Sequence, residues 1–102
     1  MSRGQEDSSW TFLTNHAQVL LAISRNPDIR LRDLSQHIGI TERAAQRIVV
    51  DLVDGGYVKR RRVGRRNHYT VNPSVEMRHA AQEGHPIGQL LNLLELRDQV
   101  AT

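Results

Sequence analysis

The sequence predicts a small α+β domain that is mainly helical, with a three-helix core, a β-hairpin and an additional C-terminal helix. Three observations predict this class. Apolar residues recur at spacings of three and four before residue 55 and again after residue 86, which is the helical period. The segment Gly39-Ile40-Thr41 separates two of the helical stretches. Two strand-like segments lie on either side of Gly64, as in a hairpin.

Size and composition are those of a small globular protein. The 102 residues, 38% hydrophobic and 25% charged, are enough for one domain with a single core. They leave no room for a deep enzyme cleft. The sequence also lacks a nucleophile–base group, paired carboxylates and a phosphate-binding glycine loop, so neither an enzyme nor a cofactor is predicted. No cysteine is present, which excludes disulfides and zinc–thiolate sites.

No membrane segment or signal peptide is predicted. The longest apolar run, Val19 to Ile23, is far too short to cross a bilayer. Residues 1–9 are polar and lack the apolar stretch of a signal peptide, so we expect a disordered tail there. The five histidines are scattered, with no pair spaced i, i+4, and no metal site is predicted.

The first helix is predicted over residues 15–25. Thr14 can cap its start, because a hydroxyl at this position accepts a hydrogen bond from a first-turn backbone N–H. Asn26-Pro27 ends it, since proline disfavours helical geometry in the residue before it. Apolar residues cover most of the circumference of this helix, which places it at the centre of the fold or against a partner chain.

Two further helices form a helix-turn-helix. The second runs over residues 31–37 and ends at Gly39, which readily adopts the left-handed backbone that terminates a helix. Thr41 caps the third helix, which continues to Asp54. The face of this helix that we expect to be buried comprises Ala45, Ile48, Val49 and Leu52.

The other face of the third helix carries long polar side chains near the helix start. They belong to Glu42, Arg43, Gln46 and Arg47. Arginine and glutamine present donors in planar pairs, which match the edges of guanine and adenine in a major groove. A solvated face that binds nothing is the alternative interpretation.

A β-hairpin with a cationic tip is predicted over residues 57–71. Because a lone hairpin is only marginally stable, it must pack on the helices, and the expected anchors are Tyr57, Val58, Tyr69 and Val71. Six of the fourteen Lys and Arg residues lie within eight positions without an acidic residue between them: Lys59, Arg60, Arg61, Arg62, Arg65 and Arg66. Such a patch favours a polyanion, and a solubilising loop is the alternative.

The C-terminal part is predicted to be a helical extension used for dimerisation. Residues 75–82 could form a short helix, and Pro86 suits the first turn of a last helix. Leucines at helical spacing follow it, more than a small domain can readily bury alone, although an intrachain cap on the core is the alternative. The predicted dimer-interface residues are Trp10, Phe12, Leu13, Ile87, Leu90, Leu91 and Leu94.

Residues 31–71 resemble the winged helix-turn-helix domain of bacterial transcriptional regulators, closest to the MarR and ArsR type. The resemblance rests on the spacing from the helix-turn-helix to a glycine and on to the hairpin, or wing. The matching residues are Leu34, Ile38-Gly39-Ile40-Thr41, Ala45, Arg47, Leu52, Gly56-Tyr57-Val58 and Arg62-Val63-Gly64-Arg65-Arg66-Asn67-His68-Tyr69. It implies a DNA-binding domain over residues 10–73, followed by the extension over residues 74–102.

The resemblance further implies a sequence-specific regulator that binds double-stranded DNA as a homodimer on a palindromic operator. The third helix would lie in the major groove and the wing on the backbone or in the minor groove. The implied DNA-binding residues are Arg30, Arg32, Thr41, Glu42, Arg43, Gln46, Arg47, Lys59, Arg60, Arg61, Arg62, Arg65, Arg66, Asn67 and His68. We therefore expect a cytoplasmic protein that is nucleoid-associated when bound to DNA, with no membrane partner and an effector that stays unknown.

Two other functions fit the same residues. One is a protein-interaction or RNA-binding winged helix that uses the basic wing on an acidic partner. The other is a nonspecific, chromatin-type DNA-binding protein. Competition between a palindromic and a random duplex separates them from a regulator, because only a regulator prefers one duplex by orders of magnitude.

Overall fold

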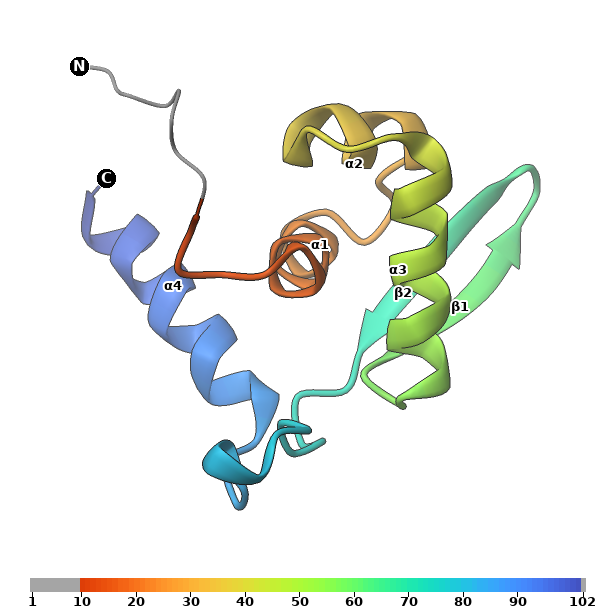
Figure 1. Ribbon diagram of the computed structural model, residues 1–102. Helices are drawn as coiled ribbons and strands as arrows, with labels where there is room; N and C mark the ends of the chain where they lie inside the picture. Colours follow the sequence, from red (N-terminus) through yellow and green to blue (C-terminus); the bar gives the residue numbers. More distant parts are fainter. Residues whose placement is uncertain (1–9, 102) are drawn as a thin grey trace.

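A computed structural model describes residues 10–101, so the predicted tail over residues 1–9 lies outside the part described. Figure 1 shows the order of the elements along the chain. They are α1 (Asn15–Arg25), α2 (Leu31–Ile38), α3 (Glu42–Asp54), β1 (Val58–Val63), β2 (Arg66–Val71), the short 3₁₀ helix η1 (Ala80–Gln82) and α4 (Ile87–Ala101). Helices α1 to α3 with the hairpin form a winged helix-turn-helix, which confirms the predicted fold class.

The helix ends follow the local signals in the sequence. The hydroxyl of Thr14 accepts from the backbone N–H of Ala17 at 3.2 Å, and that of Thr41 accepts from Ala44 at 3.0 Å. Gly39 ends α2 with φ +88°, a left-handed conformation that costs other residues free energy. The two threonine hydroxyls thereby satisfy first-turn N–H groups that have no partner within the helix.

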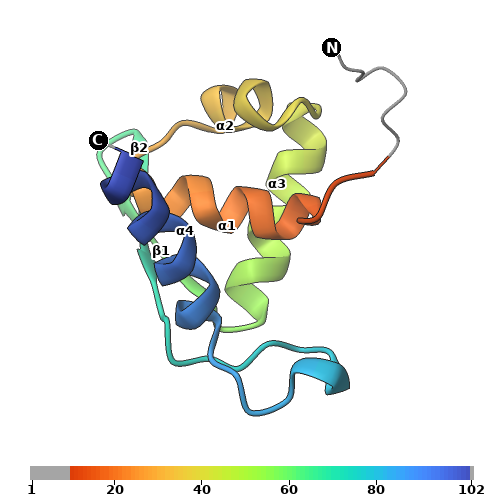
Figure 2. The same ribbon diagram turned by 90° about the vertical axis from the view of Figure 1, so that its left-hand side faces the viewer.

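Helix α1 lies at the centre of the fold. In Figure 1 it is seen end-on, with α2 above it, α3 on one side and α4 on the other, and Figure 2 shows α4 crossing in front of it. Five consecutive residues of α1, 19–23, are buried, because neighbouring elements cover the helix on several sides. The largest side chains with almost no exposed area are Ile23, Leu34, Val19, Val49 and Val58.

The hairpin is fastened to the helices at its base. Strands β1 and β2 pair antiparallel, with Val58 opposite Val71 and Val63 opposite Arg66. Tyr57, Val58 and Tyr69 are buried in the core and Val71 packs against it, as expected for the anchors. The rest of β1 is exposed, so the wing projects from the core.

Residues 74–86 form no helix of the length expected. The chain is held by a bridge between Glu76 and Pro86, and only residues 80–82 form a 3₁₀ turn. The Glu76 carboxylate accepts from the N–H of Gly84 at 3.1 Å, and the His79 ring accepts from the N–H of Ala81 at 3.0 Å. Such local bonds between side chain and backbone compete with helix formation, and they explain why the prediction of a helix over residues 75–82 was wrong.

Helix α4 lies against the core by its first turns. Ile87 and Leu91 are only 8% and 7% exposed, so two of the residues assigned to a dimer interface are buried within the chain and leave little surface for a partner. The start of α4 also touches the backbone after the wing, because a Cβ at Gly88 would lie 2.7 Å from the Cβ of Pro73.

Large apolar side chains stay exposed near both ends of the described chain, and Val50 on α3 and Val63 on β1 are exposed as well. Trp10, Phe12 and Leu93 are 70%, 91% and 64% exposed, while Leu13, Leu90 and Leu94 are half-buried. Leu93 was not among the residues predicted to meet a partner. None of the helices within residues 10–101 combines the length and the apolarity that crossing a bilayer requires.

Candidate nucleic-acid interface

The outward face of α3 carries the polar side chains predicted to meet DNA. Ala45, Ile48, Val49 and Leu52 are buried, so the opposite side of the helix faces outward. Exposed residues on that side include Glu42, Arg43, Gln46, Arg47 and Val50. Because Arg43, Arg47 and Val50 are spaced i, i+4 and i+7, they form one stripe along the helix. The stripe is free of covering protein within the described chain, as a reading surface requires.

Val50 belongs to this stripe and was not predicted to be a DNA-binding residue. It is 38% exposed and lies three residues beyond Arg47. Its spacing could have identified it, but an apolar residue on a polar helix face is easily assigned to the core. An exposed valine in a major groove can contact the methyl group of thymine.

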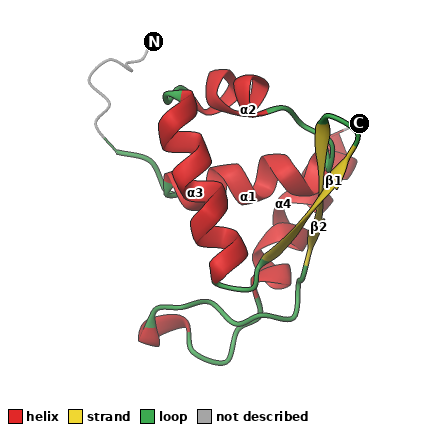
Figure 3. Cartoon of the chain, turned by 90° about the vertical axis from the view of Figure 1, so that its right-hand side faces the viewer, coloured by secondary structure: helices red, strands yellow, loops and turns green. Residues whose placement is uncertain are grey.

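The hairpin and α3 lie on the same side of α1. Figure 1 shows both elements on its right-hand side, and Figure 3, seen from that side, shows them next to each other with α1 behind. The exposed cations of the wing are Lys59, Arg60, Arg61, Arg62, Arg65 and Arg66. Arg30 and Arg32, at the start of α2, are also exposed. One side of the molecule therefore presents a helix with exposed arginine and glutamine side chains and a cationic hairpin.

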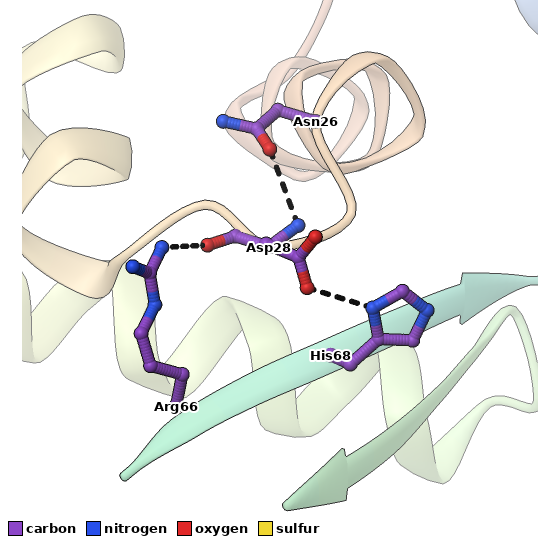
Figure 4. Close-up of polar contacts among 4 residues, drawn as sticks. All are labelled: Asn26, Asp28, Arg66 and His68. Atoms are coloured by element: carbon purple, nitrogen blue, oxygen red, sulfur yellow. Dashed lines mark hydrogen bonds and ion pairs between the residues drawn. The ribbon is translucent and has the colours of Figure 1, made fainter. Parts of the chain in front are cut away.

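Two of the predicted DNA-binding residues also bond to the linker between α1 and α2. Arg66 Nη2 donates to the main-chain carbonyl of Asp28 at 2.6 Å, and His68 Nδ1 lies 2.7 Å from Asp28 Oδ1 (Figure 4). An ionised carboxylate only accepts hydrogen bonds, so Nδ1 carries the proton in this contact. His68 is accordingly placed to hold the wing, and its contact with DNA stays a prediction.

A second histidine–aspartate contact joins α3 to α1. His16 Nε2 lies 2.9 Å from Asp51 Oδ2, and both side chains are about half exposed. They lie at a groove of ≈ 700 Å³ between the start of α1, the end of α3, residues 77–79 and the start of α4. This contact links the C-terminal half of α3 to the start of α1. Within residues 10–101, no three histidine, cysteine or acidic residues are arranged to hold a metal ion.

Comparisons with known proteins match this geometry. A sequence profile of the MarR family matches residues 11–66, which is more than half of the chain. Among solved structures, the chain resembles a MarR protein from Peptoclostridium difficile, with 16% identity over 86% of this chain and 52% of that one and a TM-score of 0.58. A search of curated proteins found no match.

Two further structures share the fold. The first is Streptococcus pneumoniae FabT in complex with DNA, at 19% identity and a TM-score of 0.57, covering 97% of this chain and 61% of that one. The second is the antimony-specific transcriptional repressor AntR, at 15% identity and a TM-score of 0.53, covering 99% and 96%. The chain thus spans about half to three fifths of the first two proteins and almost all of the third.

Proposed function

The chain belongs to the MarR family, whose members are transcriptional regulators rather than enzymes, and we propose that it binds double-stranded DNA of specific sequence as a homodimer. The observation that carries this proposal is the common side on which α3 and the wing lie. A duplex can meet both elements at once, with α3 in the major groove and the wing along the adjacent backbone. The DNA in the FabT complex supports the same assignment by analogy of fold.

The proposed division of labour follows from the chemistry of the exposed side chains. Arg43, Gln46 and Arg47 reach base edges, while Thr41 and Glu42 lie at the edge of the groove. The methyl groups of Val50 meet thymine. On the wing and at the start of α2, the side chains that meet phosphates are Arg30, Arg32, Lys59, Arg60, Arg61 and Arg62. Arg65, in the hairpin turn, meets the phosphates that flank the minor groove, where a narrow groove strengthens the negative potential.

Arg47→Ala should weaken binding to the cognate duplex by about 1–3 kcal/mol if Arg47 reads a base. The cognate duplex is first selected from a random pool at physiological salt, and affinities are then measured by fluorescence anisotropy. Arg47→Lys is the matched control, because lysine keeps the charge but lacks the planar fork that contacts guanine with two hydrogen bonds. Both variants should lose preference for the cognate over a random duplex. An unchanged preference in both would show that Arg47 reads no base.

The competition experiment also decides between the proposed function and its alternatives. A regulator prefers the selected duplex over a random one by a large factor, about 10³ or more. A nonspecific DNA-binding protein would show a ratio near one. A protein whose target is RNA or an acidic protein would bind that target more tightly than it binds any DNA duplex.

The homodimer is proposed from the apolar side chains left exposed on α4 and in the segment before α1. Leu93 on α4 and Trp10 and Phe12 before α1 are exposed, and Leu13, Leu90 and Leu94 are half-buried. Because α3 and α4 lie on opposite sides of α1 (Figures 1 and 2), pairing through residues 74–102 leaves the reading helix uncovered. Two copies would then meet half-sites roughly 34 Å apart.

Leu93→Asp should raise the dissociation constant of the dimer at least about tenfold, because it places a charge in an apolar contact. Analytical ultracentrifugation over a range of concentrations measures this change. Gln82→Glu adds the same charge at an exposed position outside α4 and should leave the dimer unchanged. Equal dissociation constants for the wild type and Leu93→Asp would remove α4 from the interface.

A further inference from the structure

The linker between α1 and α2 is bonded to β2 at three points. The N–H of Tyr69 donates to the carbonyl of Pro27 at 2.9 Å, Arg66 Nη2 donates to the carbonyl of Asp28 at 2.6 Å, and His68 Nδ1 donates to the carboxylate of Asp28 at 2.7 Å. Asn26 Oδ1 in turn accepts from the N–H of Asp28 at 3.2 Å, which shapes the turn that presents the carboxylate (Figure 4). The linker therefore runs along the edge of β2 that β1 does not occupy.

These contacts reach the part of the wing that the core does not hold. Arg66 is the first residue of β2 and pairs with Val63 across the hairpin, directly beside the turn. The buried anchors of the wing reach no further than Tyr69, which is in the third of the six residue pairs counted from the base, and β1 is exposed beyond Val58. Two-stranded hairpins have little stability of their own. Without the linker, the distal half of the wing would be free to change its angle to α3.

We propose that Asp28 is a positioning residue for DNA binding: its carboxylate, through His68, sets the angle of the wing relative to α3. This inference rests on the proposed function, because the angle matters only if one duplex meets both elements. Asp28 touches no base or phosphate itself. It acts by holding β2 in place, and with β2 the cations that this strand and the hairpin turn carry.

The charge of Asp28 makes the proposal testable by the sign of the effect. The carboxylate lies beside the densest cluster of cations in the chain. If it were only a negative charge near a polyanion, its removal would tighten DNA binding. If it positions the wing, its removal weakens binding even though the protein becomes more positive. The two roles therefore predict opposite changes in DNA affinity when the carboxylate is removed.

Two variants with equal net charge isolate the contact. Asp28→Ala removes the acceptor, whereas Asp28→Asn keeps an oxygen that can accept from His68 Nδ1. The main-chain carbonyls of Pro27 and Asp28 remain in both variants, so the fold is expected to persist. Asp33→Ala, at an exposed position on α2, is the control for the loss of one negative charge.

We expect Asp28→Ala to bind the cognate duplex about fivefold more weakly than wild type, since one charge-assisted hydrogen bond at a half-exposed site is lost. Asp28→Asn should recover to within about twofold of wild type, and Asp33→Ala should bind as tightly as wild type or more tightly. Once His68→Ala is present, adding Asp28→Ala should cause no further loss. Affinity of Asp28→Ala equal to or above that of Asp33→Ala would overturn the proposal.

A measurement without DNA separates this proposal from the proposed function. Residual dipolar couplings of backbone amides report the orientation of the wing relative to α1 and α3 in the free protein. The couplings of the wing should change in Asp28→Ala and should match the wild-type values again in Asp28→Asn. Unchanged couplings in Asp28→Ala would refute the positioning role whether or not the protein binds DNA. A wild-type protein that binds no duplex, with couplings that do change, would instead refute the function and leave Asp28 as the residue that sets the wing angle.

Discussion

Replacing Arg62 and Arg65 together by alanine should weaken binding to every duplex by roughly 60-fold per bound protomer at about 0.1 M salt. Each phosphate contact releases condensed counterions, and the logarithm of the association constant falls with a slope of about −0.9 per contact. Two lost contacts in each protomer therefore reduce the salt slope by about 2, and the affinity by almost two powers of ten, for each protomer on the duplex. Fluorescence anisotropy titrations at four or more salt concentrations measure both quantities.

The ratio between cognate and random duplexes distinguishes this double variant from Arg47→Ala. Wing cations contribute affinity without sequence choice, so the ratio should hold while both affinities fall. Arg78→Ala, which removes an exposed cation of the 74–86 segment, controls for the change in overall charge and should have little effect. A salt slope that the double variant shares with wild type would mean that the wing tip does not touch phosphate.

The sequence predicted elements whose signals are local. Helix α1 begins and ends where predicted, since Thr14 and Pro27 act within a few residues of the ends they determine. The glycine and threonine of the turn, Gly39 and Thr41, behave as expected for the same reason. The buried face of α3 follows from spacing alone. The MarR resemblance is confirmed by the family match, whereas the likeness to ArsR proteins stays a prediction.

The features that the sequence did not reveal depend on contacts between distant residues. Asp28 and His68 are forty positions apart, and nothing in either neighbourhood indicates the other. The helical spacing of Ile87, Leu90, Leu91 and Leu94 predicts a helix but not which members face the chain's own core. That division depends on where Pro73 brings the start of α4, which is a property of the folded chain. The exposed cations of the candidate site could thus be predicted from the sequence. The hydrogen bonds within the chain that hold them in place could not.

Leu34→Ala should lower the free energy of unfolding by about 3–4 kcal/mol. Leu34 is completely buried in α2, where it packs in the cluster formed with α1 and α3, and alanine would leave a cavity there. Small domains are stable by only about 5–15 kcal/mol, so the melting temperature should fall by roughly 15–25 °C. Urea titration monitored by circular dichroism measures the change. A loss below about 1 kcal/mol would mean that the helix-turn-helix does not depend on this contact.

The dependence of α2 on Leu34 is strong because the helix has little local support. It has only eight residues, and Arg30 occupies its N-cap position without making a side-chain capping bond. Arg30→Asn should therefore restore about 1 kcal/mol in the Leu34→Ala background, since the backbone of residue 30 already has the extended cap geometry. If Arg30 contacts phosphate, the same substitution in the wild-type chain should raise stability while weakening DNA binding and reducing the salt slope by about 1. A gain in stability together with a loss of DNA affinity would explain why residue 30 is an arginine, which is a poor capping residue. A gain in stability with no loss of affinity would exclude Arg30 from the interface.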